Sequence, residues 1–238
     1  MDVNGGISGM RKINYGVFQG SCGGPLLFIV FFNDIMELQD DQTMITGYAD
    51  DNNYKITLSE DVAANERMVN EKLVEVEEYM NANRLKFNAS KTQLMIMTPK
   101  KTIVNSMLEL EFNGLRIIPE KKAKFLGILI SDDLTWDNYV AHSEFSLLKF
   151  CADRLKALKK LRKFCTMDQL KLLSHGLITS KIIYGLPVWA NVKIALKKKV
   201  QAVMTEMYRV ITNDWKSSVG ALHRGLDAFS YDGWVKYG

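Results

Sequence analysis

The sequence is poor in the residues that would indicate a disulfide framework, a zinc site or a metal-binding histidine cluster. Its 238 residues include only three cysteines, Cys22, Cys151 and Cys165, with no Cys-x-x-Cys spacing. An odd and widely spaced set predicts reduced thiols in an intracellular protein. The three histidines are also far apart in the chain, which indicates surface or core positions rather than ligands.

Long apolar runs are missing as well. The longest, residues 25–32, is far too short to span a bilayer, and no basic-then-apolar leader opens the chain. We therefore expect neither a membrane anchor nor a secretory signal. The chain contains 47% hydrophobic and 24% charged residues, which is typical of a globular protein large enough for one large domain or two small ones.

Charge is distributed unevenly along the chain, although the net charge is only +4. Residues 1–136 contain 14 Lys and Arg against 19 Asp and Glu, whereas residues 137–238 contain 17 against 8. A basic C-terminal part beside an acidic part suggests that one region grips a polyanion and the other processes it.

Two adjacent aspartates, Asp50 and Asp51, lie between segments that can pair as strands. Residues 54–58 alternate apolar and polar side chains, and Asp-Asp-Asn-Asn supplies residues that tolerate a turn. The pattern predicts a β-hairpin with both carboxylates at its tip. Such hard oxygen ligands suit Mg²⁺ or Mn²⁺ and a metal-bound phosphate, although a solvated turn is the simpler interpretation.

The remaining patterns predict an α+β protein. Residues 16–38 read as a glycine-rich loop and an apolar helix buried on every side, with Ser21 as a cap and Pro25 in its first turn. Strands are expected at 94–97, 108–112, 115–118 and 123–130, and helices at 61–82, 142–164, 168–178 and 195–212. We expect no regular structure in the last 25 residues.

Several motifs together resemble the reverse transcriptases of non-LTR retrotransposons, in particular the jockey-like elements. These are GVFQGSCGGPLLFIVFFNDI, GYADD, NANRLKFNASKTQLMIM, KFLGILI and DDLTWDNYV, in this order. The resemblance implies a partial polymerase palm, an antiparallel sheet with packed helices, over residues 1–136. A helical, basic, thumb-like module would follow over residues 137–238.

The resemblance also assigns roles to individual residues. It implies that Asp50 and Asp51 bind the catalytic Mg²⁺ or Mn²⁺ and that Lys91 protonates the departing pyrophosphate. The nucleotide and template would contact the loop of Gln19, Gly20 and Ser21 and the aromatic Tyr48. The primer end would be gripped by Phe125, Leu126 and Gly127. The implied partners are an RNA template, a DNA primer and deoxynucleoside triphosphates.

The sequence departs from the family pattern at three points. Phe18 replaces a proline, and Cys22-Gly23 replaces an apolar pair. In addition, the family places a further metal-binding aspartate well upstream of the glycine-rich loop, whereas only 15 residues precede Gly16, and Asp2 does not match that position. We therefore expect the upstream palm and fingers to be missing from this chain, and the chain alone to be inactive.

Other functions remain open at this stage. A degenerate mobile-element remnant would act at most as a nucleic-acid-binding module. A group II intron maturase or a telomerase-like polymerase also has a palm with an Asp-Asp pair, but the segments Leu134–Asp137 and Asn88–Thr92 fit the non-LTR elements better. An unrelated protein with an Asp-Asp hairpin is the remaining alternative.

Overall fold

A computed structural model describes residues 2–3, 6–7, 16, 20–86, 88, 91–98, 110–112, 114–226 and 230–237. The chain divides into two compact units, residues 1–92 with 106–118 and residues 93–105 with 119–238. Within the described residues, helices alternate with separate two-stranded antiparallel sheets. The predicted α+β class is confirmed.

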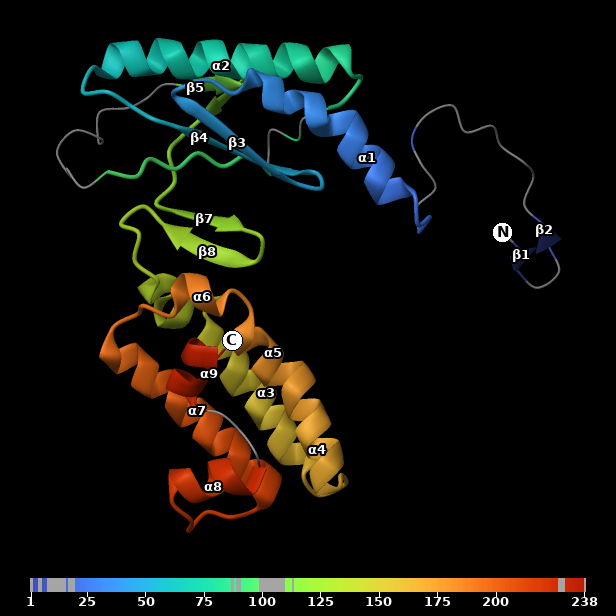
Figure 1. The fold of residues 1–238 in the computed structure, drawn as a ribbon, viewed down its shortest axis with the longest axis vertical. Helices are drawn as coiled ribbons and strands as arrows, with labels where there is room; N and C mark the ends of the chain where they lie inside the picture. Colours follow the sequence, from blue (N-terminus) through green and yellow to red (C-terminus); the bar gives the residue numbers. More distant parts are fainter. Residues whose placement is uncertain are drawn as a thin grey trace. The chain divides into compact units, whose positions relative to one another are not determined.

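The first unit contains the aspartate hairpin and the helices that support it (Figure 1). Its elements are β1 (Asp2–Val3), β2 (Gly6–Ile7), α1 (Gly24–Phe32), the 3₁₀ helix η1 (Asn33–Leu38), β3 (Thr43–Tyr48), β4 (Asp51–Ile56), α2 (Val62–Ala82), β5 (Leu110–Phe112) and β6 (Leu115–Ile117). The predicted hairpins around residues 49–50 and 113–114 are confirmed.

Helix α2 forms as its apolar spacing predicts. Asp61 caps it, because its carboxylate accepts a hydrogen bond from the Ala64 N–H at 3.1 Å. Val69, Val76 and Met80 are buried along one stripe. Through this stripe the helix packs against β5 and η1. Met80 also belongs to the apolar cluster against which Tyr54 of the hairpin packs.

Helix α1 does not have the all-round burial that its composition predicts. Only the side carrying Phe28 and Phe32 meets the small apolar cluster around Ile35 and Met80. The opposite side is exposed, and Leu26 and Val30 each keep 65% of their surface accessible. A buried position requires neighbours on every side, and the described part of the chain supplies them on one side only.

The second unit combines one hairpin with a helical bundle. Its elements are β7 (Lys122–Phe125), β8 (Ile128–Ser131), the π-helical turn η3 (Asn138–His142), α3 (Leu147–Leu161), α4 (Met167–Ser174), the π-helical turn η4 (His175–Thr179), α5 (Ser180–Ile183), α6 (Leu186–Trp189), α7 (Ile194–Thr212), α8 (Val219–Leu226) and α9 (Tyr231–Tyr237). The capping box that the sequence indicates at Thr166 and Gln169 is present at the start of α4.

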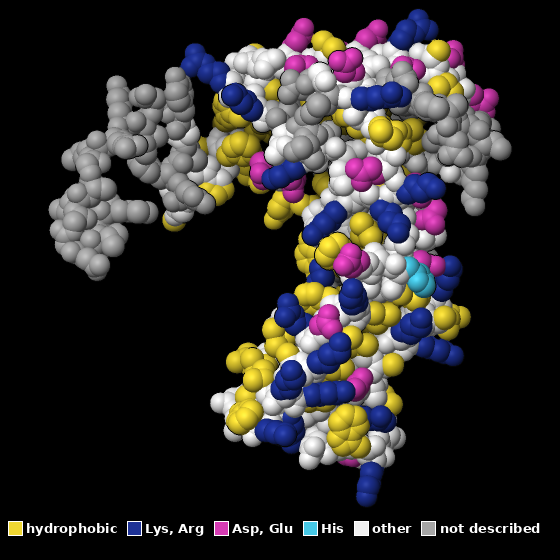
Figure 2. All heavy atoms as spheres, turned by 180° about the vertical axis from the view of Figure 1, so that it is seen from behind, with side chains coloured by type: hydrophobic (Ala, Val, Ile, Leu, Met, Phe, Trp, Pro, Cys, Tyr) yellow, Lys and Arg dark blue, Asp and Glu magenta, His cyan; other side chains and the backbone are white. Residues whose placement is uncertain are grey.

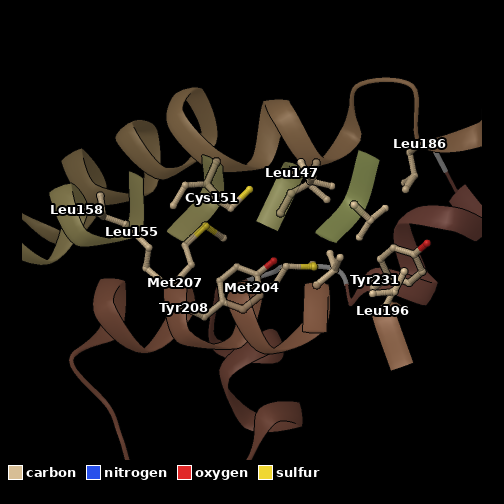
Figure 3. Packing of buried hydrophobic residues seen from close by; sticks show 14 of the residues in the cluster. Leu147, Cys151, Leu155, Leu158, Leu186, Leu196, Met204, Met207, Tyr208 and Tyr231 are labelled. Carbon is tan, nitrogen blue, oxygen red and sulfur yellow. The ribbon is translucent and has the colours of Figure 1, made fainter. Parts of the chain in front are cut away.

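The core of this unit lies between α3 and α7 (Figure 3). Leu147, Cys151, Leu155 and Leu158 line the buried side of α3, and Met204 and Met207 belong to the facing helix α7. Burial raises the pKa of the Cys151 thiol to about 12, although Lys181 nearby acts in the opposite direction. Cys22 is exposed and Cys165 is partly buried.

Three predicted elements differ in the structure. Residues 123–130 form the β7–β8 hairpin rather than one strand, because Leu126 and Gly127 adopt left-handed conformations that reverse the chain. Residues 94–97 form only a single bridge, from Leu94 to Pro119. The C-terminal residues form α8 and α9, whose Leu222 and Tyr231 are buried in the core of the unit. Tertiary packing orders these segments despite their weak local pattern.

The contacts group residues 119–136 with the helices, whereas the sequence suggests a palm portion ending at residue 136. Ile128, Leu129 and Trp136 pack against the helical core, which explains the grouping. Among the described residues, no helix has both the length and the apolar character that crossing a bilayer requires.

Candidate functional site

The adjacent aspartates lie at the tip of the β3–β4 hairpin, as predicted. Tyr48 pairs with Asp51, so that Ala49 and Asp50 form a two-residue loop. Asp50 therefore lies in the loop, Asp51 is the first residue of β4, and both are exposed. Tyr48 keeps 66% of its surface accessible beside them. The hairpin thus presents two carboxylates and an aromatic ring on one short, ordered turn.

Ala49 gives this turn its shape at a cost in strain. Its φ is +54°, in the left-handed region that residues other than glycine, asparagine and aspartate rarely occupy. Strained backbone of this kind persists where the surrounding structure fixes it, and it is concentrated at functional sites. Here the paired strands on both sides hold the alanine in place.

The carboxylates at the tip differ from the other adjacent aspartate pairs of the chain. In the pair 40–41, Asp40 forms an ion pair with Lys72 at 2.8 Å. In the pair 132–133, Asp133 accepts hydrogen bonds from the Thr135 N–H and hydroxyl. Within the described residues, neither tip carboxylate has a hydrogen bond or ion pair. Two unneutralised carboxylates held side by side are suited to bind a cation.

An ion pair lies at the start of β3, between the exposed Asp40 and the partly buried Lys72. The Asp40 carboxylate accepts hydrogen bonds from the Gln42 and Thr43 N–H groups and from Lys72, and these lower its pKa to about 2, with Lys72 contributing most. Burial alone would lower the pKa of Lys72, but its hydrogen bonds to Asp40 and Glu75 outweigh burial and raise it. No local pattern indicates the role of Lys72, because its partner Asp40 lies 32 positions away in the chain.

The body of the hairpin is packed against the apolar cluster of the first unit. Tyr54 on β4 reaches this cluster, and burial, followed by the proximity of Tyr79, raises its pKa to about 12. Gly47 faces Asn52 across the strands, and a Cβ there would lie 3.2 Å from the Asn52 Oδ1. A side chain at position 47 would therefore require the Asn52 side chain to shift.

The chemistry of the tip fits a hard divalent cation in part. Carboxylate oxygens are the ligands that Mg²⁺ and Mn²⁺ prefer, and both tip carboxylates are available. Within the described residues, no group of three or more His, Cys, Asp and Glu side chains gathers as a metal site. The pair therefore supplies part of a coordination shell.

The glycine-rich loop is described only in part. Gly20 has a left-handed φ of +86°, and a Cβ there would meet no atom within 4 Å. Ser21 accepts a hydrogen bond from the Gly24 N–H at 3.1 Å and so supports the start of α1, as predicted. Gln19, which the resemblance assigns to the nucleotide and template, lies outside the described residues.

Lys91 is exposed, and its backbone N–H donates a hydrogen bond to the Asn88 carbonyl at 2.9 Å. Within the described residues it has no hydrogen bond or ion pair to either tip aspartate. Its predicted role as a proton donor stays a prediction.

Phe125, Leu126 and Gly127 are brought together at the tip of the β7–β8 hairpin, in the second unit. The φ values of Leu126 and Gly127 are +46° and +79°. The Leu126 carbonyl accepts a hydrogen bond from the Tyr184 hydroxyl at 2.5 Å. Sequence reasoning missed this partner, since a tyrosine 58 positions away carries no local signal.

Comparison with known proteins adds a family assignment to this geometry. The family model described as reverse transcriptase (RNA-dependent DNA polymerase) matches residues 2–130. Two similar proteins are from Drosophila melanogaster. The probable RNA-directed DNA polymerase from transposon X-element is 23% identical over 92% of this chain and 24% of its own length. The RNA-directed DNA polymerase from mobile element jockey is 23% identical over 95% of this chain and 25% of its own length.

The chain thus spans about a quarter of the length of these curated relatives. No solved structure matches it significantly. The family match covers more than half of the chain and includes the aspartate hairpin and the β7–β8 turn. The chain therefore belongs to the reverse transcriptase family, with relatives among the non-LTR retrotransposons.

Proposed function

We propose that this chain is the part of an RNA-directed DNA polymerase that carries the metal-binding aspartate pair and an adjoining helical module for nucleic acid. The observation that carries the proposal is the β3–β4 tip, where Asp50 and Asp51 are exposed and unneutralised. The family match over residues 2–130 supports it.

Each group has a defined part in this proposal. Asp50 and Asp51 hold the divalent cation, which when bound neutralises charge on the phosphoryl group being transferred. Tyr48 offers an exposed ring face beside the reacting nucleotide. Lys91 donates a proton to the departing pyrophosphate, and the β7–β8 tip contacts the primer end.

Metal binding tests the aspartate pair directly. We expect Mn²⁺ to bind the chain weakly, as measured by water-proton relaxation, and Asp50→Asn with Asp51→Asn to abolish that binding. The matched control is Asp132→Asn with Asp133→Asn, which also removes two adjacent carboxylates from a turn. Equal losses in both double variants would show only general charge attraction and would contradict the proposal.

Primer extension tests the activity of the chain itself. Two-metal catalysis requires both cations to be held in a preorganised geometry, and the described residues provide two carboxylates for it. We therefore expect no extension of a DNA primer on an RNA template with Mg²⁺ or Mn²⁺. Extension that Asp50→Ala abolishes would show instead that this chain is a complete enzyme.

A nucleic-acid-binding module without catalysis is the second candidate, and the lysines of α3 favour it. Lys149, Lys156 and Lys160 follow one another at helical spacing and are exposed, and Lys149 and Lys160 form no ion pair with any described residue. Figure 2 shows Lys and Arg side chains over the helical part of the chain. Duplex binding without any Mn²⁺ site at the β3–β4 tip would favour this candidate.

A further inference from the structure

The tip of the β7–β8 hairpin is tied to the helical bundle by one side chain. The Tyr184 hydroxyl donates to the Leu126 carbonyl at 2.5 Å, and its ring lies 3.7 Å from the position of a Cβ at Gly127. Tyr184 follows α5, and it and the hairpin both belong to the second unit. The contact therefore joins residues 58 positions apart within one compact body.

The tip needs such a tie because its conformation is strained. Leu126 has a φ of +46°, which a leucine rarely adopts, and the carbonyl that Tyr184 binds belongs to this residue. A hydrogen bond to a residue in a sparsely populated conformation favours that conformation over the alternatives. The tyrosine thus contacts the hairpin at a residue whose backbone is strained.

Tyr184 is itself held firmly. Its carbonyl accepts a hydrogen bond from the Trp189 Nε1 at 3.1 Å, and Trp189 is fully buried. Gly185 turns the chain with a φ of +63° and lies against Ile128 of β8. The Lys181 ammonium lies 5.5 Å from the centre of the Tyr184 ring. These contacts fix the backbone and one ring face of the tyrosine.

We propose that Tyr184 is a positioning residue that sets the orientation of the Leu126–Gly127 turn for contact with a primer end. The inference rests on the proposed function, because the turn has a task only if the chain binds a primer–template duplex. Tyr184 acts through the Leu126 carbonyl and need not touch nucleic acid. The aromatic ring spans the gap between the Tyr184 backbone and the turn, and the hydroxyl donates the hydrogen bond to the Leu126 carbonyl.

The test compares Tyr184→Phe with Tyr139→Phe in the full chain. Tyr139 is a matched control, because its hydroxyl is buried with no hydrogen-bond partner among the described residues. Amide hydrogen exchange over residues 125–128 reports on the hairpin tip. We expect Tyr184→Phe to speed this exchange about fivefold, which corresponds to the loss of one hydrogen bond. Tyr139→Phe should leave it unchanged.

A second measurement connects the tie to the primer end. Fluorescence anisotropy compares two RNA–DNA duplexes of equal length, one with a recessed DNA 3′ end and one blunt. We expect the wild-type chain to prefer the recessed end and Tyr184→Phe to reduce that preference severalfold, without changing the affinity for the blunt duplex. If Tyr184 had only a structural role, the ratio of the affinities for the recessed and the blunt duplex would not change.

The outcomes separate the two proposals. Unchanged amide exchange over residues 125–128 in Tyr184→Phe would show that the Tyr184 hydroxyl does not hold the turn, and would overturn the proposal. Faster exchange with an unchanged end preference overturns its role at the primer. A wild-type chain without any end preference contradicts the grip assigned to the β7–β8 tip, and with it the task proposed for Tyr184, whatever the exchange rates are.

Discussion

At the scale of single residues, the surroundings of each aspartate decide what it can do. The chain contains three pairs of consecutive aspartates, and the dipeptide sequence alone does not distinguish them. The carboxylates of Asp40 and Asp133 accept hydrogen bonds from neighbouring residues and so stabilise local structure. The pair at the β3–β4 tip keeps its oxygens available. This difference identifies the functional candidate more directly than the sequence motif does.

Asp40 should make stability depend on pH in a narrow acidic range. Its pKa is lowered to about 2 in the folded chain, mainly by Lys72, from an ordinary value of 3.8. Its contribution is therefore complete above about pH 4 and is lost as the pH falls through about 2. We expect urea unfolding to show Asp40→Asn less stable than wild type at pH 7 and nearly equal to it at pH 2. A constant difference between these pH values would contradict the assignment.

Ala49 should respond to glycine with a gain in stability. The left-handed conformation costs alanine roughly 1–2 kcal/mol, whereas glycine adopts it freely and loses part of that advantage through its flexible unfolded chain. We expect Ala49→Gly to stabilise the hairpin by about 0.5–1 kcal/mol. Slower amide exchange along β3 and β4 would confirm the gain. Faster exchange would mean that the turn is not strained.

At the scale of elements, the turn at Gly185 joins the β7–β8 hairpin to the bundle. Its φ is +63°, and a Cβ there would lie 2.4 Å from the Ile128 Cδ1. We expect Gly185→Ala to lower the free energy of unfolding by about 1–2 kcal/mol from the backbone alone, and further through the contact with Ile128. Thermal or urea unfolding measures the loss.

Two further variants separate these causes. Ile128→Val removes the Cδ1 atom, so that adding it to Gly185→Ala should recover the steric part of the loss and leave the backbone part. Gly176→Ala is the matched control, because Gly176 lies in a helical turn with open space at its Cβ position. We expect it to be neutral or to stabilise by about 0.4–1 kcal/mol. Equal losses at both glycines would contradict the argument.

The elements also show how far the sequence alone can reach. Periodic segments such as α2 and α7 and the Thr166 capping box were predictable, because the signal is contained within a few turns of helix. The exposure of α1 was not predictable, since an apolar segment does not reveal which neighbours surround it. The residue pattern did not predict the β7–β8 turn, because Leu126 carries no turn signal and its conformation depends on tertiary contacts. Only the family resemblance implied a hairpin at these residues.

The same contrast applies to the candidate site. The aspartate hairpin follows from alternation and turn residues near one another in the chain. The contacts of Lys72 with Asp40 and of Tyr184 with Leu126 join distant segments, and no spacing rule predicts them. The family resemblance supplied the roles of Gln19, Lys91 and the β7–β8 tip, and these roles remain predictions.

At the scale of the whole molecule, the two units differ in charge. Helix α2, which carries Glu66, Glu71, Glu75 and Glu78, belongs to the unit with the metal-binding candidate. The lysines of α3 belong to the other unit. Lys149 and Lys160 are 11 positions apart on one helix, which corresponds to about 16 Å. A stripe of this length can follow several phosphates of a duplex independently of its sequence.

Duplex binding should therefore depend steeply on salt. With about three phosphate contacts, we expect a plot of log affinity against log salt concentration to have a slope of about −3. Lys149→Gln with Lys160→Gln should make the slope shallower by about 2. The control Arg67→Gln removes an exposed charge from α2 and should leave the slope unchanged. A salt-independent affinity would exclude the helical unit as a phosphate-binding surface.

The contrast between the three thiols has a practical consequence for labelling. Cys151 is buried in the α3–α7 core and has a raised pKa, so that it stays protonated and unreactive toward maleimides at neutral pH. Cys22 is exposed two residues before α1, and Cys165→Ser would remove the partly buried competitor. A single fluorophore can then be attached beside the glycine-rich loop without unfolding the chain. A change in its emission on adding a primer–template duplex or a nucleoside triphosphate would test the contact proposed for that loop.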